Sequence, residues 1–287
     1  MLDSAESSCD DGRSEEEAPL SLCIAAMCRH EDQPCIVQCC DTAGTRGEVK
    51  SDDILKIRTV GANTVLLAGN MSYARELLSE CKPFIERYQV GGDDLAITGL
   101  IQGLVEAVRL RKRAMATAAL SAELGVTYDE VFNWSQAHPT NPTWIHAWEQ
   151  IRQIHLGAAL IMSTFTDDEA AIVAIDPSGS VVWCDHYAAM GTGNNIASVI
   201  LAQRDYDDAM KLDECVYRVI EAKVAAEKDL HVGQSTVLEF SVSGRASRGF
   251  EQGYVDTLTA SVRKRMKKRV EFTLNFQFVH DVPGKNK

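Results

Sequence analysis

Cysteine and histidine are the side chains of this sequence with the clearest potential for metal binding or nucleophilic catalysis. The chain holds nine cysteines and seven histidines, and they are scattered along it. The densest group, Cys35, Cys39 and Cys40, lacks the second pair of ligands that a structural zinc site places at short spacing. The histidines include no partner for a serine or cysteine at a spacing typical of a Ser-His-Asp triad. We therefore expect no metal and no other cofactor.

Charge and cysteine usage narrow the class of protein further. A net charge of −12 argues against nucleic acid as a partner, because nucleic-acid binding requires a concentrated positive surface. An odd number of cysteines in a chain of this length is atypical of a secreted disulfide framework, whereas apolar cysteines fit buried strands in a reducing compartment. No window approaches 18 consecutive apolar residues, so we expect no membrane span. These features predict a cytoplasmic protein.

The first 20 residues differ in composition from the rest of the chain. Residues 1–18 carry seven acidic side chains, one arginine and almost no large apolar side chain. Such a segment cannot bury enough apolar surface to fold, so we predict that residues 1–20 are a disordered acidic leader or propeptide. Residues 21–287 are predicted to form a single domain, with a helical elaboration near residues 110–155 and a C-terminal extension after residue 243.

Beyond the leader, short apolar runs alternate with segments of helical periodicity. Ser21–Cys28 and Cys35–Cys40 are continuous apolar runs joined by a polar turn, which predicts a hairpin buried on both faces. Pairs of strands alternate with pairs of helices, and this order favours two stacked sheets covered by helices on both outer sides. The other predicted strands are 54–60, 63–68, 170–175, 180–184, 235–242 and 270–278, and the predicted helices are 71–90, 95–108, 120–155, 190–203, 211–227 and 255–268.

Four short motifs follow one another along the chain. A strand begins at Ser21 with Ser-Leu-Cys-Ile-Ala-Ala, and Cys39–Asp41 is followed by a lysine-bearing segment, Ser51–Ile57. Leu67–Asn70 opens a long helix with Ala-Gly, and Asp176–Asp229 contains a Pro-Ser-Gly turn and a Gly-Thr-Gly segment. In this order and spacing the motifs resemble the β-type subunits of the proteasome and its bacterial relatives, which are N-terminal-nucleophile hydrolases.

The resemblance covers roughly residues 21–242, with one interruption near residues 110–155. It implies an α+β fold, a four-layer αββα sandwich of two antiparallel sheets. It also implies peptide-bond hydrolysis by a nucleophile that is the first residue of the mature chain and whose proton is taken by its own α-amine. As partners it implies polypeptide substrates, further copies of this chain in a ring, and an ATP-dependent unfoldase that delivers substrate.

Carried over residue by residue, the resemblance assigns a catalytic role to four positions. Ser21 carries the nucleophilic hydroxyl, and Gly69 supplies the backbone N–H that holds the oxyanion. Lys56 lowers the pKa of the hydroxyl electrostatically, and Asp41 holds the lysine in place. The family nucleophile is usually threonine, and serine keeps its hydroxyl but lacks the methyl group that restricts the rotamer. Activity therefore requires removal of residues 1–20.

Two further positions match supporting residues of the family, and three features depart from its pattern. Thr192 falls on the supporting hydroxyl of a Gly-Ser-Gly segment, and Asp229 falls on a late aspartate. Leu20 stands where many family leaders end in glycine, and Val232 replaces the serine that follows the late aspartate. The arginine expected shortly after Asp41 is absent. We therefore expect one supporting hydrogen bond around the α-amine to be missing.

Each of these residues also fits an ordinary structural role. Ser21 fits the polar start of a strand, Asp41 a turn carboxylate, and Lys56 a solvated charged turn. Thr192 equally fits a helix N-cap. Cys23 is a rival nucleophile, because the superfamily includes cysteine-type enzymes, although its position inside a strand favours core packing. Two alternatives to a peptidase stay open: a catalytically inactive structural subunit or scaffold that keeps its leader, and an enzyme that cleaves small-molecule amides.

Overall fold

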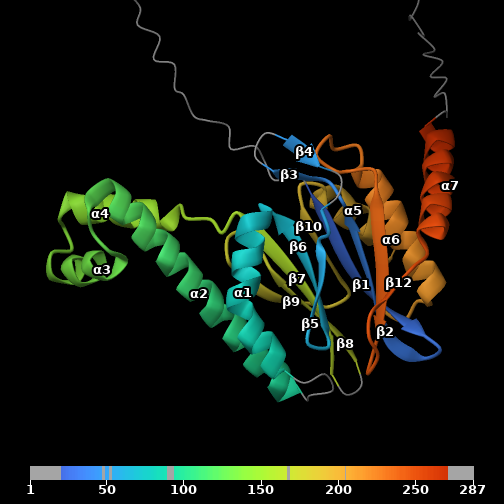
Figure 1. Cartoon of the computed structure of the whole chain (residues 1–287), viewed down its shortest axis with the longest axis horizontal. Coiled ribbons are helices and arrows are strands. Elements are labelled where there is room, and N and C mark those ends of the chain that lie inside the picture. Colours follow the sequence, from blue (N-terminus) through green and yellow to red (C-terminus); the bar gives the residue numbers. More distant parts are fainter. Residues whose placement is uncertain are drawn as a thin grey trace, which may run out of the picture.

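The computed structural model describes residues 21–46, 49–51, 54–88, 94–166, 169–203 and 205–270. Within these residues two antiparallel sheets pack face to face, and helices cover the outer face of each sheet (Figure 1). The predicted α+β class and four-layer αββα sandwich are confirmed. The predicted leader, residues 1–20, and nearly all of the predicted strand 270–278 lie outside the described residues.

The first sheet is built around the hairpin at the start of the described chain. Its strands are β1 (Leu22–His30), β2 (Gln33–Asp41), β10 (Tyr187–Gly191), β11 (Thr236–Val242) and β12 (Arg248–Gly249). They lie in the order β10-β1-β2-β11-β12, and neighbouring strands are antiparallel. A short separate pair follows the hairpin and consists of β3 (Gly44–Arg46) and β4 (Val49–Ser51). The predicted hairpin is confirmed.

The second sheet contains a central strand that the sequence does not predict. Its strands, in the order in which they pair, are β5 (Ile57–Val60), β6 (Asn63–Gly69), β7 (Ala158–Phe165), β8 (Ala170–Ile175) and β9 (Val181–Cys184). β7 pairs with both β6 and β8, and all its residues are buried. Its apolar run, Ala158–Met162, is short and has no periodicity that separates strand from helix, which is why β7 is missed. The predicted helix 190–203 is wrong at its start. β10 continues to Gly191, and α5 begins at Asn194.

Helices complete the outer layers. They are α1 (Met71–Arg87), α2 (Asp94–Leu124), α3 (Tyr128–Ala137), α4 (Pro142–Arg152), α5 (Asn194–Gln203), α6 (Leu212–Ala226) and α7 (Gln252–Val270). α1 and the first half of α2 pack on the second sheet, and α5 and α6 pack on the first sheet (Figure 1). α7 packs against α6 and β11 at the edge of the molecule.

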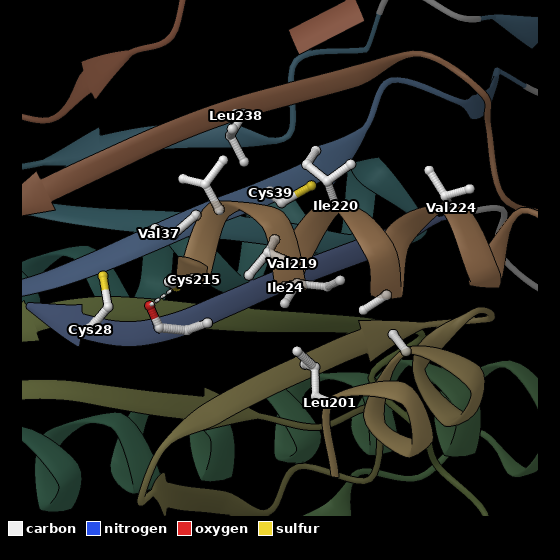
Figure 2. Close-up of a cluster of buried hydrophobic side chains, with 14 of the residues drawn as sticks. Ile24, Cys28, Val37, Cys39, Leu201, Cys215, Val219, Ile220, Val224 and Leu238 are labelled. Atoms are coloured by element: carbon white, nitrogen blue, oxygen red, sulfur yellow. Dashed lines mark hydrogen bonds between the residues drawn. The ribbon is translucent and has the colours of Figure 1, made fainter. Parts of the chain in front are cut away.

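Alternation along the hairpin divides its side chains between two cores. Ile24 and Cys39 face the helical layer, where Val219 of α6 lies over them (Figure 2). Cys23 and Cys40 face the second sheet and belong to the core between the sheets. Because neighbouring residues of a strand point to opposite faces, consecutive cysteines diverge and act as apolar fillers. Every position of the hairpin near its open end is therefore fixed by packing on two sides.

α2 continues past the sandwich and carries α3 and α4 at its far end (Figure 1). This arm falls within residues 110–155 and has a small core of its own, formed by Leu120, Val131 and Ala147 with two tryptophans packed against it. Thr127 and Glu130 form a reciprocal capping box that starts α3. None of the described helices, α2 included, is both long enough and apolar enough to cross a membrane.

The core between the sheets generates a stability prediction. Ile161 of β7 has 0% exposure there, so Ile161→Ala should lower the free energy of unfolding by about 3 kcal/mol through lost burial and a residual cavity. The matched control is Val182→Ala on β9, which is 46% exposed and should leave the urea midpoint nearly unchanged. Equal shifts of the two midpoints would contradict the assignment of β7 to the sandwich core.

Candidate active site

The open end of the β1–β2 hairpin places Ser21 beside Asp41. Cys23 pairs with Cys40, so Leu22 lies opposite Asp41, the last residue of β2, and Ser21 lies one residue further, just before β1. The Leu22 amide donates a hydrogen bond of 2.8 Å to Asp41 Oδ1. Both Ser21 and Asp41 are fully buried. The two-sided burial of the hairpin fixes this register, because a shift by one residue would turn every side chain to the wrong face.

Lys56 reaches the same place from the second sheet. It directly precedes β5, and its carbonyl accepts a hydrogen bond of 2.9 Å from the Leu67 amide, which extends the pairing of β5 with β6. Its Nζ lies 2.6 Å from Asp41 Oδ1, and both side chains have 0% exposure. The interpretation of Lys56 as part of a solvated charged turn is therefore wrong. The ion pair joins the two sheets, and desolvation makes each charge dependent on the other.

The second oxygen of Asp41 is bound by the loop between α6 and β11. The Gly233 amide donates a hydrogen bond of 2.8 Å to Asp41 Oδ2. A Cβ at Gly233 would lie 2.5 Å from Ala43 Cβ and 3.1 Å from Asp41 Oδ2, so only glycine fits without displacing its neighbours. With the Leu22 amide and the Lys56 ammonium, three donors therefore hold this carboxylate and set its orientation.

Gly69 ends β6 and presents its amide to Ser21. It donates a hydrogen bond of 3.2 Å to Ser21 Oγ. Its φ of +91° favours glycine, and a Cβ there would lie 2.7 Å from the Gly157 carbonyl oxygen. Asn70 follows immediately as the N-cap of α1 and accepts hydrogen bonds from the first turn. The turn from strand to helix thus aims one backbone N–H at the hydroxyl.

Gly191 and Thr192 close the site on the side of β10. Gly191 pairs with Leu22 and has a φ of +103°. A Cβ at Gly191 would lie 2.2 Å from the Ser21 carbonyl oxygen and 2.8 Å from Ser21 Oγ. The Thr192 hydroxyl donates a hydrogen bond of 3.3 Å to the Ser21 carbonyl oxygen. Thr192 therefore contacts Ser21 through its backbone, and Gly191 leaves the space that the serine occupies.

Asp229 and Val232 lie in the loop that also contains Gly233. The Asp229 carboxylate accepts a hydrogen bond of 2.9 Å from the His231 amide, which stabilises the turn. Among the described residues, the hydrogen bonds of Asp229 are local and none joins it to Ser21. Val232 is buried, and a Cβ at Gly193 would lie 2.6 Å from its Cγ2. Hydrogen bonds and the ion pair thus link five of the six residues assigned from the resemblance, directly or through the Leu22 amide, whereas the hydrogen bonds of Asp229 stay within its own segment.

Comparison with known proteins agrees with this architecture. Residues 148–237 match the family model described as proteasome subunit. A proteasome subunit beta of Methanopyrus kandleri is 35% identical over 80 residues, which is 28% of this chain and 37% of that protein. This chain is similar to proteasome β-type subunits. The residues that match the family model run from the second half of α4 to the first residues of β11.

The matched segment contains only some of the residues of the candidate active site. Residues 148–237 include Thr192 and Gly233, whereas Ser21 and Lys56 come earlier in the chain. The match therefore supports the sandwich and the walls formed by β10 and the α6–β11 loop. The placement of Ser21, Lys56 and Asp41 rests on three contacts: the Gly69 amide with Ser21 Oγ, the Lys56 ammonium with Asp41, and the Leu22 amide, next to Ser21, with Asp41.

The rival nucleophile Cys23 is poorly suited to attack a substrate. It has 0% exposure, and its thiol donates a hydrogen bond of 3.2 Å to the Leu67 carbonyl oxygen. Burial raises the pKa of Cys23 to about 12, and the Lys56 ammonium opposes that rise only in part. The thiolate is the reactive form of cysteine, so this side chain stays inert at neutral pH.

Gly233 and Gly191 are the residues that sequence reasoning left without a role of their own. Each allows a backbone approach that a Cβ would block, and Gly233 also binds Asp41 directly. For Gly191 the sequence offers one weak signal of a role in the site, its position next to Thr192 in the Gly-Thr-Gly segment. For Gly233 the sequence shows only a glycine in a loop after a helix. This position predicts a turn, and it does not predict a hydrogen bond to a carboxylate far away in the chain.

The buried ion pair generates a second prediction. Asp41→Asn leaves the Lys56 ammonium buried without its anion, so we expect a loss of about 3–5 kcal/mol in the free energy of unfolding. Adding Lys56→Met should recover part of that loss, because the uncompensated charge is removed. Glu106→Gln, in an exposed pair with Arg109, is the matched control and should not shift the urea midpoint. A double variant no more stable than Asp41→Asn would contradict the mutual dependence of the two charges.

The burial of Cys23 generates a third prediction. At pH 8 a thiol with a pKa of about 12 is ionised in about one molecule in 10⁴. Iodoacetamide at that pH should therefore label the partly exposed Cys184 in the native protein and leave Cys23 unmodified. Peptide mass spectrometry measures both, and labelling in urea, where Cys23 should react, is the control. Rapid labelling of Cys23 in the native protein would contradict this prediction and make Cys23 a candidate nucleophile again.

Proposed function

We propose that this chain is a peptidase of the N-terminal-nucleophile class, with Ser21 as the nucleophile once the residues before it are removed. The observation that carries the proposal is the 3.2 Å hydrogen bond from the Gly69 amide to Ser21 Oγ, beside the buried Asp41–Lys56 pair. When Oγ attacks a substrate carbonyl, the negative charge develops on the carbonyl oxygen, which is bound to the same carbon atom as Oγ. The same N–H is therefore in reach of the oxyanion.

The proposed reaction uses the new α-amino group of Ser21 as the base. Such a group titrates at roughly pH 7.7–8.0, so a useful fraction is neutral in the cell. Ser21 Oγ adds to the carbonyl carbon of a peptide bond, and its proton passes to the α-amine. The C–N bond then breaks, and the leaving amine takes that proton. Water then adds to the ester carbonyl and gives a proton to the α-amine, the C–Oγ bond breaks, Oγ takes that proton back, and the carboxylic acid product leaves.

Lys56 and Asp41 supply the electrostatic part of the proposal. The Lys56 ammonium is held on Asp41 Oδ1, the oxygen that also binds the amide of Leu22, which follows Ser21 directly. A positive charge beside the hydroxyl favours the transfer of its proton to the base. Because three donors orient Asp41, the ammonium is fixed before substrate arrives, and no reorganisation is needed during the reaction.

Cleavage of the Leu20–Ser21 bond is a condition of this activity. While Leu20 is attached, the nitrogen of Ser21 is an amide without a basic lone pair. The Ser21 side chain also has no solvent exposure in the uncleaved chain. The resemblance further supports polypeptide substrates, a cytoplasmic location, assembly of copies into a ring and delivery of substrate by an ATP-dependent unfoldase, all of which belong to this proposal.

One observation favours a second candidate, a catalytically inactive proteasome-like subunit or scaffold. Val232 places an apolar side chain where the family carries a serine near the α-amine, and it packs tightly over Gly193. In this alternative the Leu20–Ser21 bond stays intact, and the site only joins the two sheets. An enzyme acting on small-molecule amides would share the cleaved N-terminus with the peptidase and differ in its substrates.

The fourth prediction separates these functions. N-terminal sequencing and intact-mass measurement of protein from its native cell should give a chain that begins at Ser21. That protein should cleave fluorogenic peptides faster than simple acyl amides, and Ser21→Ala should lower kcat/KM by about 10³-fold or more because the nucleophile is lost. Ser21→Thr and Cys23→Ala are the matched controls that should keep activity.

A chain that begins at Met1 in every preparation and cleaves no peptide would favour the inactive subunit. Preferential cleavage of acyl amides would favour the amidase. Loss of activity in Cys23→Ala with retention in Ser21→Ala would transfer the nucleophile to the thiol and contradict the proposal.

A further inference from the structure

A buried charge cluster lies at the C-terminal end of α6, outside the residues used so far. Glu227 is 9% exposed and accepts hydrogen bonds from Arg263 of α7, with Nε on Oε2 and Nη2 on Oε1, each at 2.7 Å. The Lys223 ammonium, with 0% exposure, lies 2.5 Å from Glu227 Oε1. Burial lowers the pKa of Lys223, and the Glu227 carboxylate opposes this shift. Two cations, the buried Lys223 and the 33%-exposed Arg263, thus share one nearly buried carboxylate.

Both cations also bind one backbone oxygen. The Gln234 carbonyl accepts a hydrogen bond of 2.9 Å from Lys223 Nζ and one of 2.7 Å from Arg263 Nη2. Gln234 directly follows Gly233, whose amide binds Asp41 Oδ2 at 2.8 Å. The position of that amide is therefore constrained from two sides, by the carboxylate on one and by the doubly bound carbonyl on the other.

α7 makes a second contact of the same kind. Gln252, at its first turn, donates a hydrogen bond of 3.2 Å to the Thr236 carbonyl oxygen, and Thr236 is the residue of β11 that pairs with Asp41. α7 therefore binds the backbone at two positions, Gln234 and Thr236, that follow Gly233 along the chain. Val255 and Val262 are buried in the helical core, so apolar packing already attaches α7 to α6 without these polar contacts.

We propose that Arg263, through Glu227 and the Gln234 carbonyl, is a positioning residue that holds the Gly233 amide on Asp41. The rigid, planar guanidinium binds both carboxylate oxygens in a bidentate fork while its Nη2 also binds the carbonyl, whereas the Lys223 ammonium binds the same carbonyl but only one of the carboxylate oxygens. The effect on the loop follows from these contacts alone. Its effect on turnover rests on the proposed function, because it requires Asp41 to orient Lys56 beside Ser21.

The fifth prediction tests the loop in the full chain by hydrogen–deuterium exchange, resolved to single amides by mass spectrometry. Arg263→Ala should speed exchange of the Gly233 amide, and of the Leu22 amide on Asp41 Oδ1, about tenfold, since both depend on the carboxylate's position. Exchange at Ile161 in the sandwich core should not change. Arg265→Ala on the same helix, which removes contacts with Tyr217 (an exposed hydrogen bond to its hydroxyl and a cation–π contact with its ring), is the matched control.

Arg263→Lys keeps the charge and is the second variant to test in case Arg263→Ala fails to fold; it should give an intermediate rate because the fork is lost. Rates at Gly233 and Leu22 within twofold of wild type in both variants, with faster exchange along α7, would overturn the proposal and leave Arg263 as a tie between helices.

Turnover provides a separate readout. In protein that cleaves peptides, Arg263→Ala should lower kcat about tenfold with KM changed less than twofold, Arg263→Lys should recover part of the loss, and Arg265→Ala should match wild type. An unchanged kcat with altered Gly233 exchange would overturn the link to catalysis. If wild-type protein cleaves no peptide, the proposed function fails, and the exchange rates still decide whether Arg263 positions the loop.

Discussion

The buried ion pair between Asp41 and Lys56 is the interaction on which the site depends, because it joins the two sheets at their shared end. Asp41 belongs to the first sheet and Lys56 to the second, and neither side chain contacts solvent. Since each charge needs the other, the sheets can pack here only in the arrangement that brings both groups together. The amides of Leu22 and Gly233 then fix the remaining freedom of the carboxylate.

Space around Ser21 is created by backbone instead of side chains. Gly69 and Gly191 both have positive φ, and a Cβ at either position would overlap neighbouring backbone. Their strand ends can therefore approach Ser21 closely from two directions, one donating an N–H and the other leaving room for the hydroxyl. Strand ends, where pairing stops and the chain turns, are the parts of a sandwich that can supply such geometry without interrupting a sheet.

The sequence allows prediction of the sandwich and of most site residues, for identifiable reasons. The β1–β2 hairpin has continuous apolar runs on both sides of a polar turn, and Ser21, Asp41, Lys56 and Gly69 fall in motifs with a recognisable order. β7 is not predictable from its pattern, because a uniformly buried strand lacks alternation. The contact of Gly233 with Asp41 joins residues far apart in the chain, and the local turn of Asp229 depends on loop geometry; neither leaves a signal in local sequence.

The energetics of the pair bear on the choice between an enzyme and a scaffold. A buried ion pair is a weak source of stability, since well-packed apolar residues of similar volume often stabilise a protein as well or better. A subunit that only had to join its sheets at this point would lose little by replacing Asp41 and Lys56 with such residues. An ammonium fixed on the carboxylate that also binds the Leu22 amide, next to a hydroxyl that accepts a backbone N–H, has in contrast a direct use in the proposed acyl transfer. The cost of burying these charges is therefore an argument for the proposed chemistry at Ser21 and against a role limited to the stability of the sandwich.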